Sequence, residues 1–183
     1  REVEFTIAKK EVTASVTVGG EYVYNGKDIE PTDITVRDGE DIIPDTEYTV
    51  SFGDNRNAGT ARVMITNVEG GNYIVNGTGE FEISRANITV KPKNISKVYG
   101  SAPEFKLESD SGLITEKELA AFSSTATFRS EGAEKTADVI DGGYEITAEL
   151  TENETDNLIL TLSGTGILTV VPKKLTVTVN DVS

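Results

Sequence analysis

Carboxylates are the side chains of this chain best suited to chemistry, and two stretches concentrate them, residues 108–112 and 152–157. Carboxylate and amide oxygens are the ligands that Ca²⁺ prefers in proteins. Neither stretch has the spacing of an EF-hand loop, in which ligands recur at alternate positions before a glycine and a final glutamate. Two interpretations therefore remain for these stretches, solvated acidic loops or calcium sites, and we expect no other cofactor.

The composition excludes most catalytic chemistry. The 183 residues include no His, no Cys and no Trp, so the commonest general base, the commonest metal ligand and the thiolate nucleophile are absent. A carboxylate pair acting on glycosides would need a cleft and a raised pKa, for which small β modules leave little room. No nucleophile–base pairing is visible. We predict that the protein is not an enzyme and has no catalytic, cofactor-binding or metal-binding residues.

Lysines and tyrosines suggest two further kinds of site. Lys10, Lys173 and Lys174 lie where strand-like segments meet, and an isopeptide bond to Asn or Asp there is one interpretation, with solvated lysines as the other. Several tyrosines recur at equivalent positions, which favours packing of turns onto the core over a shared binding face. The six tyrosines are Tyr22, Tyr24, Tyr48, Tyr73, Tyr99 and Tyr144.

The charge balance restricts the partners. Seventeen Lys and Arg against 31 Asp and Glu give a formal net charge of −14, which repels a polyanion, so nucleic acid is not expected to bind. No apolar run approaches the length of a membrane span. The first four residues alternate like a strand and do not resemble a signal peptide. A segment taken from the middle of a secreted protein would have these features, and we expect no membrane insertion by this segment.

One strand-like phrase occurs three times, at residues 5–13, 81–89 and 168–176. Each copy has an apolar–polar–apolar triplet, a small or basic stretch, and then an aliphatic residue followed by Thr. The copies begin 81 − 5 = 76 and 168 − 81 = 87 residues apart, a spacing that indicates tandem modules.

The repeat sets the expected domain boundaries. We predict a first module over residues 11–86 and a second over residues 87–172. Residues 1–10 are then the closing strand of a preceding module, and residues 173–183 the opening strand of a following one. No Gly/Ser-rich or Pro-rich linker separates the modules, so we expect neighbouring modules to keep a limited range of orientations.

Period-two alternation of apolar and polar residues dominates both modules and predicts half-buried antiparallel sheets. Asp38 and Gly39 lie between two apolar runs and predict a hairpin. The sequence Gly-Thr-Gly precedes the closing strand of each module, at residues 77–79 and 164–166. We expect a bend at both places, because glycine accepts backbone conformations that other residues avoid.

One segment of the second module has a helical pattern instead. Thr115 is a suitable N-cap, and Glu118 stands at the position of its capping-box partner. Leu119 and Phe122 share one face of the predicted helix, residues 115–122. The expected fold class is mainly β, with one short helix in the second module.

Several segments of the second module carry a family signature. They are Ile88-Thr89-Val90, Lys97-Val98-Tyr99-Gly100, Gly112-Leu113-Ile114, Gly142-Gly143-Tyr144-Glu145-Ile146 and residues 168–176. With these segments the module resembles the MBG-type repeats, of the Tyr-Gly variety, of large bacterial surface proteins. The last segment looks like the junction between modules in that family.

The first module resembles a related repeat of bacterial surface proteins. The residues that carry this resemblance are 24–31, 45–52, 57–61 and 71–73. Both resemblances imply tandem, extracellular, non-catalytic modules with a β-grasp-like build. An immunoglobulin-like sandwich is the alternative for the first module, in which no helix is predicted.

The sequence thus favours a structural role. We expect a stiff stalk or spacer that presents a distal adhesive domain, with the neighbouring modules of the same chain as partners. The alternative is an adhesin module that itself binds a host glycoprotein, mucin or glycan.

Overall fold

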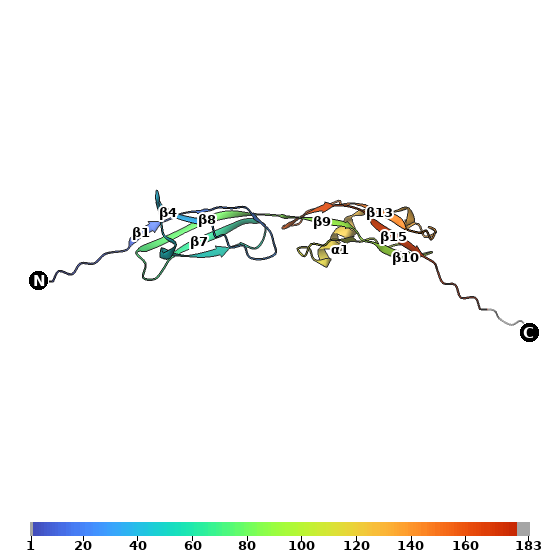
Figure 1. The fold of residues 1–183 in the computed structure, drawn as a ribbon, viewed down its shortest axis with the longest axis horizontal. Coiled ribbons are helices and arrows are strands. Elements are labelled where there is room, and N and C mark those ends of the chain that lie inside the picture. Colours follow the sequence, from blue (N-terminus) through green and yellow to red (C-terminus); the bar gives the residue numbers. More distant parts are fainter. Residues whose placement is uncertain (1, 179–183) are drawn as a thin grey trace, which may run out of the picture. The chain divides into compact units, whose positions relative to one another are not determined.

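The computed structural model of the protein describes residues 2–178. The chain divides into two compact units, Arg1–Ala86 and Asn87–Ser183. Strands form most of the regular structure in the described residues, and one α-helix lies in the second unit (Figure 1). The predicted mainly β fold class is therefore confirmed.

The larger sheet of the first unit is organised around β8 (Tyr73–Ser84), which is 12 residues long. On one side, β7 (Gly59–Asn67) pairs with it antiparallel, and β6 (Tyr48–Gly53) pairs in turn with β7. Two short strands pair with β8 in parallel, β1 (Lys10–Thr13) near its start and β3 (Tyr22–Val23) at its end. The end of β8 therefore has a strand on each side.

The smaller sheet of the first unit has three strands in the order β2 (Ser15–Val18), β4 (Ile34–Asp38) and β5 (Asp41–Ile42). The hairpin predicted at Asp38 and Gly39 is confirmed, because β4 and β5 pair antiparallel around it. Gly39 has a φ of +60°, which a glycine adopts without steric cost. A short 3₁₀ turn, η1 (Asp45–Glu47), leads into β6.

The core of the first unit combines side chains from both sheets. Val36 of β4 and Val63 of β7 are fully buried in one hydrophobic cluster, together with Val75 of β8. The alternation predicted at Ala61, Val63 and Ile65 is confirmed, since all three side chains point inward from β7. Burial of such aliphatic side chains contributes roughly 1.5–3 kcal/mol each, which makes this cluster the main source of stability.

The bend predicted at residues 77–79 is wrong, because these residues lie inside the unbroken strand β8. The chain passes close to them as it leaves β1 for β2. A Cβ on Gly77 would lie 2.7 Å from the carbonyl oxygen of Ala14, and one on Gly79 would lie 3.0 Å from Cγ1 of Val16. The two glycines therefore provide room for a crossing segment and not for a turn.

The second unit also has two sheets. The first contains, in spatial order, β10 (Ile95–Val98), β15 (Gly166–Val171), β13 (Tyr144–Glu149) and β12 (Thr127–Arg129). The second contains β11 (Leu107–Glu108), β9 (Ala86–Pro92) and β14 (Leu158–Leu162). Here the Gly-Thr-Gly bend is confirmed, because Gly164 has a φ of +75° and separates β14 from β15.

The predicted helix is confirmed as α1 (Glu116–Thr125), which continues three residues beyond Phe122. The Glu118 N–H donates to Oγ1 of Thr115 over 3.3 Å, and the Thr115 N–H donates to Oε2 of Glu118 over 2.8 Å. These reciprocal bonds are the predicted capping box. Phe122 is buried, so the helix contributes an aromatic ring to the core.

The recurring phrase occupies the same structural position in both units. Tyr22 and Val23 of β3 lie in parallel register with Ile83 and Ser84, and the Tyr24 N–H donates to the Ser84 carbonyl over 2.8 Å.

In the second unit, Lys97 and Val98 of β10 lie in parallel register with Val170 and Val171, and the Tyr99 N–H donates to the Val171 carbonyl over 2.9 Å. The phrase aligns Ser84 with Val171, so the two bonds are equivalent. In each unit, a short strand and the tyrosine directly after it, Tyr24 or Tyr99, therefore lie along the closing strand. We call this strand, with its following tyrosine, the Tyr-bearing strand.

The flanking segments are extended and have no strand partner among the described residues. Residues 2–9 and 172–178 form no regular secondary structure. Lys10, predicted in the preceding strand, is instead the first residue of β1. The assignment of residues 1–10 and 173–183 to neighbouring modules stays a prediction, and residues 1 and 179–183 lie outside the described part.

Candidate functional site

The first acidic stretch, residues 108–112, is held by hydrogen bonds of Ser109 to the backbone of β9 and to the backbone of the stretch itself. Oγ of Ser109 donates to the Thr89 carbonyl over 2.6 Å and accepts from the Ser111 N–H over 3.2 Å. Oε1 of Glu108 lies 3.5 Å from Nζ of Lys91, so a lysine already faces this carboxylate. The stretch forms a surface turn after β11.

The second acidic stretch, residues 152–157, has a similar internal organisation. Oγ1 of Thr155 accepts from the Leu158 N–H over 2.9 Å, and the Asn153 carbonyl accepts from the Leu160 N–H over 2.6 Å. These oxygens hold the turn before β14. In the described part of the chain, no three Asp or Glu side chains lie close enough together to hold a metal ion.

The lysines predicted at junctions lie in different surroundings. Lys10 forms an ion pair with Asp38, whose hydrogen bond and charge raise the pKa of the lysine. A protonated ammonium cannot attack a carboxyl carbon, so this pairing disfavours an isopeptide bond. Lys173 and Lys174 are exposed and follow the end of β15.

Lys97 is a buried lysine that the sequence reasoning missed. Its side chain is 5% exposed, and its ammonium donates to the Glu134 carbonyl. At the equivalent position of the first unit, the Tyr22 hydroxyl donates to the Gly19 carbonyl over 2.5 Å. Both side chains thus have an apolar body and a polar tip bonded to a nearby backbone carbonyl. Lys97 serves packing: it occupies a buried position of β10, and its neighbours Ser96 and Val98 are exposed, as the alternation of a strand requires.

The tyrosines mostly pack onto the units. Tyr22, Tyr24, Tyr48 and Tyr73 contact the core of the first unit. In the second unit, Tyr99 is 41% exposed, whereas Tyr144 is partly buried and its hydroxyl donates to the Asp138 carbonyl over 3.1 Å. The packing interpretation is therefore supported for the tyrosines of the first unit.

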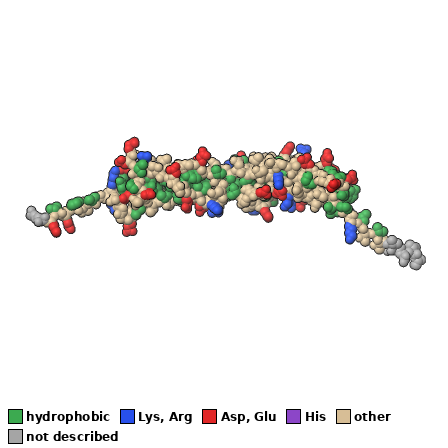
Figure 2. All heavy atoms as spheres, viewed as in Figure 1, with side chains coloured by type: hydrophobic (Ala, Val, Ile, Leu, Met, Phe, Trp, Pro, Cys, Tyr) green, Lys and Arg blue, Asp and Glu red, His purple; other side chains and the backbone are tan. Residues whose placement is uncertain are grey.

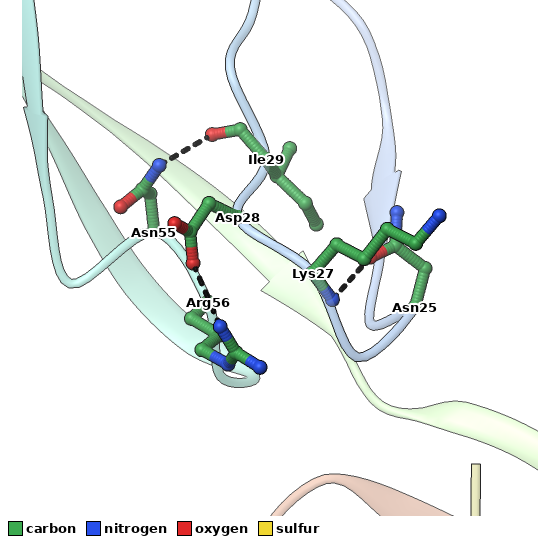
Figure 3. Close-up of polar contacts among 6 residues, drawn as sticks. All are labelled: Asn25, Lys27, Asp28, Ile29, Asn55 and Arg56. Atoms are coloured by element: carbon green, nitrogen blue, oxygen red, sulfur yellow. Dashed lines mark hydrogen bonds and ion pairs between the residues drawn. The ribbon is translucent and has the colours of Figure 1, made fainter.

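A polar loop cluster marks the end of the first unit at which β8 finishes. Nδ2 of Asn55 donates to the Ile29 carbonyl over 3.0 Å (Figure 3). The Ile29 N–H donates in return to the Asn55 carbonyl over 2.8 Å. Beside this pair, Nη1 of Arg56 lies 3.4 Å from Oδ1 of Asp28. The loop after β3 is thus fastened to the hairpin loop between β6 and β7.

Further bonds fix the shape of the same loops. The Lys27 N–H donates to Oδ1 of Asn25 over 2.9 Å, closing a turn in which Gly26 has a φ of +76° (Figure 3). Asp54 is the one non-glycine residue with positive φ among the described residues, at +56°. The cluster connects residues 28 and 29, which belong to a segment that carries the family resemblance, to Asn55 and Arg56, which lie directly before the segment 57–61. No pattern in the sequence indicates that Asn55 makes this connection.

A groove with a volume of about 860 Å³ lies in the second unit. Its apolar lining includes Leu107 and Ile114, which are buried, and Phe105, whose ring stacks on Phe128 with centroids 5.4 Å apart. Exposed charged side chains, among them Lys106, also line it. A mixed apolar and charged groove of this kind can hold an extended chain or a glycan, but it contains no nucleophile–base pair.

The charged surface does not single out one of these places. Carboxylates are spread over both units on the face that Figure 2 shows, with Lys and Arg between them.

No helix in the described residues has the length and apolar character that a membrane crossing requires.

No protein-family model matches the chain. No curated protein matches it either. The sites above are therefore interpreted from their own geometry.

Proposed function

We propose that the two units are non-catalytic modules of an MBG-type repeat array, and that the array is a stiff spacer holding a distal adhesive domain away from a bacterial surface. One observation carries the proposal. The closing strand of the first unit, β8, ends at Ser84, and β9 of the second begins at Ala86, so one residue separates two paired strands. A single intervening residue gives the chain very little slack for hinge motion.

The repeated architecture adds support. In both units the Tyr-bearing strand lies parallel to the closing strand and makes the same backbone hydrogen bond. A repeated architecture is typical of proteins that build a long array from one structural unit. We assign the second unit, with α1, a β-grasp-like build, and the first unit an immunoglobulin-like sandwich.

The test is the width of the distance distribution between the units. Since the chain has no Cys, Glu69→Cys and Asp141→Cys place one spin label on an exposed turn of each unit. Pulsed electron–electron double resonance should give a narrow distribution of label-to-label distances for the native junction. Insertion of a short Gly-Ser linker after Arg85 should broaden it strongly.

The comparison with the inserted linker decides the outcome. A native distribution as broad as that of the linker variant would refute the spacer proposal. Unfolding curves of the two labelled chains serve as the control, because the linker lies outside the paired residues of both sheets and should leave the stability of the units unchanged.

The groove of the second unit favours a second candidate function, a module that binds a host glycoprotein, mucin or glycan. Its apolar lining and charged rim have the mixed character typical of ligand sites. Binding screens against mucins, matrix proteins and glycans, with calcium and with a chelator, test this. Lys106→Glu on the exposed rim should abolish a genuine hit, and Lys135→Glu, away from the groove lining, is the matched control.

A further inference from the structure

The N-terminal segment carries the sequence of an inner strand but has no strand beside it. Phe5 and Ile7 are 82% and 84% exposed, and residues 2–9 form no regular structure. The equivalent residues of the first unit, Phe81 and Ile83, are 6% and 2% exposed. Apolar side chains at alternate positions have the pattern of a strand that buries one face.

The recurring phrase has the same kinds of neighbouring strand in both units. Ile83 has β3 on one side, through Tyr22, and β7 on the other, through Gly59. Leu168 likewise has β10 on one side, through Ile95, and β13 on the other, through Tyr144. The phrase is therefore an inner strand wherever its unit is present, with a parallel neighbour and an antiparallel neighbour.

Among the strands that the structure describes, the equivalent positions are already filled. The position between β3 and β7 is filled by the end of β8, and the position between β10 and β13 is filled by β15. The segment also precedes β1 by the same spacing that puts residues 81–84 ahead of β9. A strand that belongs to neither unit needs a third acceptor.

We propose that residues 5–8 are the closing strand of a further module body, which lacks a closing strand of its own and offers a parallel Tyr-bearing strand and an antiparallel strand. This inference rests on the proposed repeat array and names the partner of its exposed end. Figure 2 shows hydrophobic side chains along this segment, where the partner would cover them.

One residue sets the shape of that partner. Val3 stands where the first unit has Gly79 and the second has Gly166. A Cβ on Gly166 would lie 2.7 Å from the Pro92 carbonyl oxygen, and one on Gly79 would lie 3.0 Å from Val16. The partner body must therefore be more open at this position than either unit, which distinguishes it from a plain copy of them.

The experiment adds a module body that can accept residues 5–8 as its closing strand, and it leaves out Val3. A second copy of residues 10–80 is placed directly before Phe5, so that residues 5–8 follow the copied Glu80 as residues 81–84 follow the original one. Hydrogen exchange of the amides of residues 5–8 is then compared with that in the chain as it is. We expect at least about 100-fold slower exchange in the extended chain, together with an added unfolding transition.

Two variants of the extended chain serve as the positive and the negative control. Thr6→Glu with Ala8→Ser turns residues 5–8 into the sequence of residues 81–84 and should be equally protected. Phe5→Asp with Ile7→Asp should remove the protection and the added transition. In the chain without the added copy, the same two Asp substitutions should leave both units unchanged, since both side chains are exposed.

Three results would overturn the inference. In the first, residues 5–8 of the extended chain exchange fast although the variant with Thr6→Glu and Ala8→Ser is protected. In the second, residues 5–8 exchange fast in both of these chains. In the third, the variant with Phe5→Asp and Ile7→Asp is protected as well as the extended chain. The spin-label distances between Glu69 and Asp141 do not depend on residues 5–8, so the spacer proposal and this inference can fail separately.

Discussion

Gly166→Ala tests how closely the chain passes over the closing strand of the second unit. Gly166 is the first residue of β15, and an added Cβ would lie 2.7 Å from the Pro92 carbonyl oxygen and 3.0 Å from that of Lys93. Both neighbours are backbone atoms, which cannot rotate away. Reaching an ordinary contact of 3.4 Å requires a displacement of 3.4 − 2.7 = 0.7 Å at the closest atom.

The expected net effect is a loss of stability. Overpacking of this kind costs roughly 1–3 kcal/mol. Alanine offsets about 0.5–1 kcal/mol of that, because it loses less conformational freedom than glycine when a strand forms. The central values leave a net loss of about 1 kcal/mol, and the largest difference is about 2.5 kcal/mol. Each kcal/mol lost should lower the unfolding midpoint of the second unit by about 4–8 °C.

Thermal unfolding followed by hydrogen exchange of each unit measures this loss. Gly112→Ala in the same unit is the matched control, because its Cβ would meet no atom within 4 Å and its φ is not positive. The midpoint of the first unit should not move in either variant. A Gly166→Ala midpoint equal to or above that of the unchanged protein would refute the close approach.

Four further outcomes are expected. Thr115→Ala should cost about 1 kcal/mol through loss of the helix cap, and unchanged unfolding of the second unit would contradict this. The hydrogen bond from Thr115 lowers the pKa of Glu118. The stability that this carboxylate contributes should therefore be present above its ordinary pKa of about 4.3 and be lost as the pH falls through its lowered folded pKa. The unfolding midpoint of Glu118→Gln, measured against pH, should fall less in acid than that of the unchanged protein. The hydrogen bonds from Asn72 lower the pKa of Glu47, so Asn72→Ala should bring that pKa back toward its ordinary value in an NMR titration, and an unmoved titration would contradict the contact. Lys97→Met should keep or raise the midpoint of the second unit, because Met retains the apolar stem and removes a buried charge; a clear loss would show that the ammonium stabilises the fold.

Local signals in the sequence predicted much of the fold. The capping box at Thr115 and the hairpin at Asp38 depend on residues at most a few positions apart, and both are confirmed. The alternation at Ala61, Val63 and Ile65 is confirmed as an inward-facing strand. Side-chain period and turn preference act over short distances, so they are readable without the rest of the chain.

The polar sites were less predictable because their partners are distant in sequence. Asn55 bonds to Ile29 across 26 positions, and Lys97 reaches Glu134 across 37. Asn55 looks like an ordinary loop residue and Lys97 like an exposed one. Both roles depend on which segments the sheets bring together.

The Gly-Thr-Gly sequence shows most clearly the difference between local sequence signals and tertiary packing. Repeats and alternation in the sequence are enough to predict that the closing strands recur, that each follows two glycines, and that the chain is mainly β. The packing of distant segments is needed to explain why Gly164 makes a bend whereas Gly77 lies inside an unbroken strand. Both outcomes are open to a glycine, because it permits either a positive φ or the close approach of another segment. Which of these occurs at Gly77 is decided by Ala14, a residue 77 − 14 = 63 positions away.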